Sequence, residues 1–376
     1  MNIQEPLQLL GGLSPHTFMQ RHWEKKPLLI RQAIPGFQPL LDRTELLDMA
    51  AMDDVESRLV VQATPGSDKP WQFRHGPLAR KTLPPFKQPG WSVLVQGMDL
   101  HDERVHALMN QFRFVPDARL DDLMISYATD GGGVGPHFDS YDVFLLQAHG
   151  RRRWRIGRQK DMSLVPDMPL KILANFEPEQ EFVLEPGDML YLPPRYAHDG
   201  IAEGECMTYS IGFRSPSKGE VAQEVLQRMA EQAMDEAGDA IYRDPKQDAV
   251  EQSAEMPQAM VEFARDAMAA ALSDPLALPR ALGEYLTEPK ANVWFEGDDH
   301  YARGGVRLDR RTRMLFDDKH IFINGESFTA SGRDARIMRT LANQRQLSAM
   351  EAKPLSEAAR DLLGDWVQSG WVHADD

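Results

Sequence analysis

The stretch GGGVGPHFDSYDVFLLQAHGRRRWRIG, residues 131–157, holds most of what the sequence says about fold and chemistry. A glycine run precedes His137 and Asp139, which stand two residues apart. On a strand, residues two apart face the same side, so we expect the imidazole and the carboxylate to point at one ion. Such a pair arises often by chance, so the rest of the chain must decide its meaning.

Short strand-like segments surround this stretch between residues 121 and 215. Each is bounded by Gly, Pro or Asp. They are MISYA (124–128), VFLLQ (143–147), RRWRI (152–156), EFVL (181–184), MLYLP (189–193) and MTYSIGF (207–213). Because no helical pattern lies between them, they predict an antiparallel sandwich or barrel.

A second motif, EPGDMLYLPPRYAH, runs from Glu185 to His198. A tight turn, a buried strand and two prolines that end the strand place His198 at the mouth of the predicted barrel. The pattern resembles the second half of the cupin signature, with Arg195 where a cupin usually has glycine. Together with His137 and Asp139, His198 completes the facial triad typical of non-haem iron(II) oxygenases, although zinc could also occupy such a set.

Arg152 is a candidate anion-binding residue. In RRRWRIG (151–157), strand alternation puts it on the same face as Trp154 and Ile156, which marks that face as inward. The other three arginines then face solvent. A buried arginine needs an anionic partner. A dicarboxylate cosubstrate would supply one through paired, charge-assisted hydrogen bonds.

Length and composition narrow the class of protein. A chain of 376 residues is too long for one core and predicts two or three domains. Its one cysteine, Cys206, excludes a disulfide framework and a cysteine-based zinc cluster. We see neither a secretory signal nor a membrane-spanning apolar run, so we expect a cytoplasmic protein. The formal charge of -15 favours basic partners over nucleic acid, although solubility alone also explains it.

The chain changes character after residue 216. In residues 217–290, apolar residues rich in Met and Ala recur at helical spacing, which predicts helices that either pack within their own domain or form a homodimer face. Residues 291–376 combine a strand, HIFI, with an Asn324-Gly325 hairpin turn and two helices, a pattern that resembles a winged helix. Because we find no basic recognition helix, we expect a structural or protein-contact role and no direct nucleic-acid readout.

Taken together, these motifs resemble the JmjC-domain oxygenases. The histidine–aspartate pair, a basic residue thirteen positions after the aspartate, and a distal histidine after a turn, strand and double proline all match. HWEKKPLLIR, from His22 to Arg31, resembles the ribosomal oxygenases of that family, and residues 131–157 are similar to the bacterial branch. The resemblance covers the whole chain. It implies an α+β fold with a double-stranded β-helix barrel (1–216), a helical dimerisation domain (217–290) and a winged-helix-like domain (291–376).

The resemblance also implies roles for single residues. His137, Asp139 and His198 would hold Fe(II), while Arg152, helped by Ser126, would bind the far carboxylate of 2-oxoglutarate. O2 would be consumed, 2-oxoglutarate would be cleaved to succinate and carbon dioxide, and a protein side chain would be hydroxylated. The expected target is an arginine of a large-subunit ribosomal protein of the L-sixteen type. No general base is expected.

Asp130 is the candidate substrate-binding residue, and its role has two interpretations. It precedes the glycine run, so its carboxylate could lie at the rim near His137 and bind a guanidinium. Equally, it could only close the turn before Gly131. Other functions also stay open: an oxygenase for a histidyl or methyl-lysyl target, a cupin-type metalloenzyme acting on a small molecule, or a non-catalytic interaction barrel. An inward Arg152 argues against the last two, since neither needs a dicarboxylate anchor.

Overall fold

The computed structural model describes residues 2–63, 71–168, 170–298 and 304–375. The chain forms two compact units, residues 1–215 and 216–376, which are described separately below. The division into three domains that the sequence predicts, with a second boundary near residue 290, stays a prediction.

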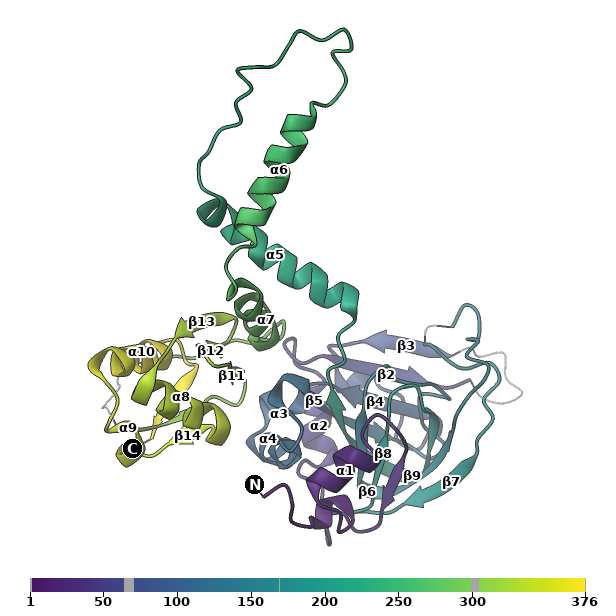
Figure 1. Ribbon diagram of the computed structural model, residues 1–376. Coiled ribbons are helices and arrows are strands. Elements are labelled where there is room, and N and C mark those ends of the chain that lie inside the picture. Colours follow the sequence, from purple (N-terminus) through teal and green to yellow (C-terminus); the bar gives the residue numbers. More distant parts are fainter. Residues whose placement is uncertain (1, 64–70, 169, 299–303, 376) are drawn as a thin grey trace. The chain divides into compact units, whose positions relative to one another are not determined.

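The first unit is built on one antiparallel sheet, with helices packed beside it (Figure 1). Its strands are β1 (Leu28–Ile30), β2 (Ser57–Val61), β3 (Gln72–His75), β4 (Trp91–Val95), β5 (Leu120–Ala128), β6 (Val143–Gly157), β7 (Gln180–Leu184), β8 (Met189–Leu192) and β9 (Ala197–Phe213). Its α-helices are α1 (Pro15–Arg21), α2 (Arg43–Met49), α3 (Met98–His101) and α4 (Glu103–Met109). Four short 3-10 helices are η1 (Gln8–Leu10), η2 (Arg80–Thr82), η3 (Asn110–Phe112) and η4 (Asp117–Arg119).

The order of the strands brings distant parts of the sequence together. It runs β1-β8-β6-β9-β5-β4-β2-β3, and β7 pairs with the carboxy-terminal half of β6. The predicted antiparallel architecture is therefore confirmed. The sheet also recruits β2, β3 and β4, from a region where the sequence showed no clear strand pattern. Strands β6 and β9 share the longest ladder, and they supply Arg152 and His198 to the candidate site.

Two of the predicted short strands, VFLLQ and RRWRI, form a single strand. Strand β6 continues from one to the other through Gly150, so the prediction of separate strands was wrong. Gly150 has φ of 62°, and a Cβ there would lie 2.0 Å from the carbonyl oxygen of Glu205. The glycine therefore lets β6 cross β9 closely and forms an irregularity in the ladder, not a turn.

The amino-terminal segment is held to the sheet by a few buried polar contacts. Ser14 caps α1 by accepting a hydrogen bond from the amide of Thr17, as its position before the helix predicts. The amide of Glu24 donates to the hydroxyl of Tyr191, which itself donates to the buried carboxylate of Asp142. β1 then pairs with β8, so the first thirty residues close one edge of the sheet.

Among the described residues, the second unit combines five helices of eleven or more residues and one short helix with two small sheets. Its helices are α5 (Lys218–Ala237), α6 (Gln258–Ala271), α7 (Ala277–Thr287), α8 (Gly332–Gln344), α9 (Ala349–Ala352) and α10 (Glu357–Gln368). Its strands are β10 (Gly305–Leu308), β11 (Met314–Phe316), β12 (His320–Ile323), β13 (Glu326–Thr329), β14 (Gln346–Leu347) and β15 (Val372–Asp375). The predicted hairpin at Asn324-Gly325 is confirmed: both residues have positive φ and join β12 to β13. Among the residues described, no helix is both long and apolar enough to cross a membrane.

Candidate metal centre

The three candidate metal ligands come from two segments that pair with each other. His198 is the second residue of β9, whereas His137 and Asp139 lie in an irregular segment between β5 and β6. Reciprocal backbone hydrogen bonds of 3.0 and 2.8 Å join His137 to His198. The prediction that His137 and Asp139 share a regular strand was wrong, because the glycine run and Pro136 cannot extend a ladder. The single bridge to His198 positions them instead.

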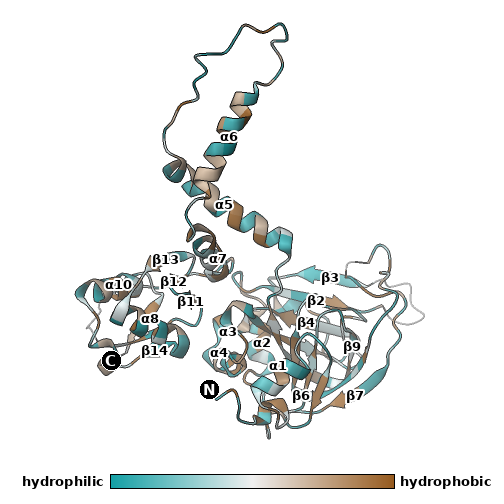
Figure 2. Cartoon of the chain, in the orientation of Figure 1, coloured by the Kyte–Doolittle hydropathy of each residue, from teal (hydrophilic) through white to brown (hydrophobic). Residues whose placement is uncertain are grey.

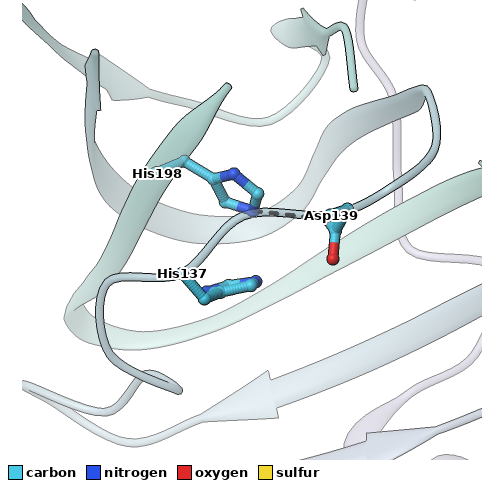
Figure 3. A group of neighbouring side chains, drawn as sticks. All are labelled: His137, Asp139 and His198. Carbon is cyan, nitrogen blue, oxygen red and sulfur yellow. Dashed lines mark ion pairs between the residues drawn. The ribbon is translucent and has the colours of Figure 1, made fainter. Parts of the chain in front are cut away.

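The side chains of His137, Asp139 and His198 converge, as Figure 3 shows. One ligand atom from each lies within 4.8 Å of the others, and the two imidazole centroids are 4.3 Å apart. His198 Nε2 lies 3.6 Å from a carboxylate oxygen of Asp139. Among the described residues, this is the one group of three or more His, Cys, Asp or Glu with such geometry. The convergence expected from the sequence is present.

Hydrogen bonds orient both imidazoles. Nδ1 of His137 lies 2.9 Å from the carbonyl oxygen of Gly135, and Nδ1 of His198 lies 3.0 Å from that of Tyr196. A carbonyl only accepts, so each Nδ1 carries the proton and each Nε2 keeps its lone pair for a metal. Burial, together with the neighbouring His137, lowers the pKa of His198 to about 4. His198 is therefore neutral at pH 7.

The donor set fits a divalent transition metal. The unprotonated Nε2 of His198 and a carboxylate oxygen of Asp139 present lone pairs to each other at 3.6 Å. That arrangement is repulsive unless a cation lies between the groups. Two imidazole nitrogens and one carboxylate oxygen are the ligands of a facial iron(II) site.

Arg152 lies inside the sheet, as strand alternation predicts. It is 4% exposed, while Arg151, Arg153 and Arg155 form ion pairs on the outer face. Its Nη1 donates to Ser126 Oγ and Thr208 Oγ1, both at 3.2 Å, and its Nη2 donates to the carbonyl of Gly200 at 3.3 Å. Its Nε has no partner among the described residues.

These contacts leave the charge of Arg152 uncompensated. All three acceptors are neutral, and a buried guanidinium without an anion is costly. An anionic ligand with two carboxylates would supply the missing partner while its other end reached the triad. The environment of Arg152 therefore fits a dicarboxylate cosubstrate.

Sequence reasoning missed two groups near these residues. Thr208 Oγ1 bonds Arg152 and donates to the fully buried Gln147; both are polar residues inside apolar strands, which is the signal that could have found them. Tyr141 lies near the carboxylate of Asp139. Burial raises the pKa of the Tyr141 hydroxyl, and the carboxylates of Asp139, Asp122 and Asp121 raise it further.

Asp130 has a different set of contacts. Its side chain is exposed, and Oδ1 accepts a hydrogen bond of 2.8 Å from the amide of Gly204. Its backbone carbonyl accepts from the amide of Gly90. Among the described contacts, none joins Asp130 to the triad, and the contacts that it makes are those of a residue that fixes a turn against β9.

Comparisons with known proteins agree with this geometry. A JmjC domain family matches residues 107–221, and a ROXA-like winged helix family matches residues 270–373. The "Ribosomal protein uL16 3-hydroxylase" of Escherichia coli (strain K12) is 37% identical over 382 residues, covering 94% of this chain and 96% of the relative.

Two solved structures of an Escherichia coli protein superpose on nearly the whole chain. The X-ray structure of E. coli ycfD has a TM-score of 0.80 at 30% identity, covering 94% of this chain and 96% of that one. A structure of YcfD, a ribosomal oxygenase, in complex with cobalt and 2-oxoglutarate has a TM-score of 0.76 at 30% identity, with the same shares of 94% and 96%. The likeness therefore extends through both units.

Proposed function

This chain belongs to the JmjC-domain ribosomal oxygenases, and we propose that it hydroxylates an arginine of a large-subunit ribosomal protein of the uL16 type. It is a 2-oxoglutarate-dependent protein hydroxylase that uses Fe(II) and O2. The proposed target follows from the uL16 relative. The observation that carries the 2-oxoglutarate dependence is Arg152, a buried cation with neutral acceptors alone among its described contacts, on the strand that pairs with that of His198.

We assign the metal to His137, Asp139 and His198, and the far carboxylate of 2-oxoglutarate to Arg152 with Ser126. The bound metal and cosubstrate supply the oxidising chemistry that inserts oxygen into a C–H bond. The protein's own groups orient the metal ligands and exclude water. The Gly135 and Tyr196 carbonyls fix the imidazoles, and the apolar interior of the sheet keeps water from Arg152.

The surroundings of Tyr141 support a cationic substrate. Tyr141 is 38% exposed, and the carboxylates of Asp139, Asp122 and Asp121 act on it electrostatically. A guanidinium placed against Tyr141 would meet negative charge and an aromatic face. Asp122 is partly held by the amide of Gly97, which fixes its orientation. Asp130 stays an alternative carboxylate for the same role.

The proposed function is tested by the mass of the substrate. Purified enzyme, Fe(II), 2-oxoglutarate and the uL16 protein of the same organism should give a product with one added oxygen, located on an arginine by fragmentation. Ribosomal proteins from cells without the gene should lack that oxygen. Oxygen on a histidine, or loss of a methyl group from a lysine, would establish one of the alternative targets instead.

The two candidate carboxylates can be separated by substitution. We expect Asp122→Asn to lower hydroxylation of the protein substrate on the order of tenfold or more, since a charge-assisted contact is lost. Asp130→Ala should leave hydroxylation within about twofold and lower stability by about 1 kcal/mol, because it removes one hydrogen bond to Gly204. Succinate formed without protein substrate reports whether the metal site survives. The opposite ranking would assign the substrate to Asp130.

We also propose a homodimer formed through α5 and α6. Val225 is the one buried residue of α5, and α6 has none. Large apolar side chains of both helices lie in water: Leu226, Met234, Met260, Phe263 and Met268. Figure 2 shows hydrophobic positions spread along the two helices between hydrophilic ones. A symmetric partner is the commonest way to cover such a surface.

A ribosomal-protein substrate also bears on where the enzyme acts. Its target is made and assembled in the cytoplasm, where we place the enzyme. The absence of direct nucleic-acid readout by residues 291–376 stays a prediction.

A further inference from the structure

Trp154 is a common neighbour of His198 and of Arg152. Its ring centroid lies 5.8 Å from that of His198, and the Arg152 guanidinium carbon lies 5.2 Å from the ring centroid of Trp154. The residue is 5% exposed and belongs to the apolar cluster on the inner side of β6 and β8. Its indole N–H has no partner among the described residues.

Gly200 makes this arrangement possible. It stands directly opposite Trp154 in the β6–β9 ladder, between the pair that contains His198 and the pair that contains Arg152. A Cβ on Gly200 would lie 2.6 and 2.7 Å from two ring carbons of Trp154 and 2.9 Å from Nε of Arg152. The ring and the guanidinium therefore occupy the space that any side chain at position 200 would fill.

We propose that Trp154, seated on Gly200, positions the guanidinium of Arg152 and thereby selects the chain length of the 2-oxo dicarboxylate. The inference rests on the proposed function, since it concerns the same cosubstrate. An arginine side chain has many rotamers. The described acceptors of Arg152 are all neutral, so no ion pair holds its guanidinium in one of them. A rigid indole beside it restricts those rotamers and fixes how far the guanidinium stands from the metal ligands.

The length of the cosubstrate follows from that separation. A dicarboxylate must reach Arg152 at one end and the triad at the other, so an acid one carbon shorter or longer would leave one end misplaced. Small errors in placement at such sites are costly. Trp154 is thus a positioning residue that acts through Arg152.

The test measures binding without turnover. Enzyme loaded with Mn(II) in place of iron is titrated calorimetrically with oxaloacetate, 2-oxoglutarate and 2-oxoadipate, and Mn(II) affinity is measured separately. Gly200→Ala should weaken 2-oxoglutarate binding about tenfold or more, because the added methyl group displaces the ring and Nε. Mn(II) affinity should stay within about twofold. Adding Trp154→Phe to Gly200→Ala should restore binding to within about threefold of the wild type, since the smaller ring makes room for the methyl group.

Trp154→Phe alone tests selectivity. It should reduce the preference for 2-oxoglutarate over 2-oxoadipate by about fivefold or more, because a smaller ring leaves Arg152 freer to retreat. The matched controls are Gly219→Ala, where a Cβ meets nothing closer than 4.0 Å, and Trp294→Phe, at an exposed tryptophan. They should change neither the affinity for 2-oxoglutarate nor the preference over 2-oxoadipate.

Three results would overturn the inference. They are a Gly200→Ala enzyme that binds 2-oxoglutarate like the wild type, a double variant as weak as the single one, and an unchanged preference in Trp154→Phe. If Gly200→Ala does not fold, the preference of Trp154→Phe decides alone. A wild type that binds no 2-oxoglutarate would refute the proposed function itself, whereas normal binding with unaltered selectivity would refute this inference and leave that function standing.

Discussion

Arg151 and Arg152 are adjacent in the sequence and lie in opposite environments. The Arg151 side chain is 55% exposed and pairs with Glu203 at 3.1 Å, whereas Arg152 is buried among neutral acceptors. We expect Arg152→Ala to weaken 2-oxoglutarate binding on the order of a hundredfold, because a buried, charge-assisted contact is lost. Arg151→Ala removes a solvent-screened pair and should change binding less than about twofold. Calorimetric titration of both variants checks this, and equal losses would contradict the assignment.

Residue-level prediction from sequence succeeded where local geometry was regular. Alternation along residues 151–157 placed Arg152 inside, because that part of β6 pairs with β9 without interruption. Alternation along these residues does not extend to Gln147 and its partner Thr208, because the ladder shifts register between Gln147 and Arg151. Only their polarity inside apolar strands marks these two residues. The interpretation of Asp130 depended on where the glycine run leads, and irregular backbone has no periodicity from which to predict a direction.

At the scale of elements, the turn between β7 and β8 joins the amino-terminal strand to the sheet through Asp188. Burial alone would raise the pKa of this carboxyl, but hydrogen bonds from the amide of Gln32, from Arg31 and from the amide of Glu185 outweigh it, so the pKa lies below its usual range. A group whose folded pKa is lowered stabilises the fold above its unfolded pKa, and that stability is lost as pH falls through the folded pKa.

We therefore expect Asp188→Asn to lower the free energy of unfolding by about 2 kcal/mol at pH 7. The difference from the wild type should shrink as the pH falls below about 4, the ordinary range for aspartate. Urea unfolding at several pH values measures it, with Asp53→Asn, at an exposed position, as the control. A difference that does not depend on pH would show that the carboxylate's charge plays no part.

The sequence predicted the existence of most elements better than their extent. Pro193-Pro194 and Asn324-Gly325 act locally, and each marks the expected boundary. Gly150 and Gly204 also look like boundaries, yet β6 and β9 pass through them. Whether a glycine ends a strand or kinks it depends on the strand opposite, which a single segment of sequence does not contain.

For the whole molecule, the exposed apolar side chains of α5 and α6 lead to a prediction about assembly. Light scattering at micromolar concentration should give the mass of a dimer, since a partner would remove Leu226 and Met234 from water. Replacing both by Asp should give monomers that still bind 2-oxoglutarate, because neither residue belongs to the first unit. Glu231→Ala, a charge removed from the same helix, is the control. A wild-type monomer would refute the dimer.

The pairing of β1 with β8 has a consequence for biosynthesis. Gln32 and Asp188, which close that edge of the sheet, are 156 residues apart in the sequence. A ribosome adds about 5–20 residues each second, so the apolar strand Leu28–Ile30 waits on the order of ten to thirty seconds for its partner to emerge. During that interval its edge is open to other chains. We therefore expect the folding yield of this chain during synthesis to depend on whatever shields nascent chains at the ribosome.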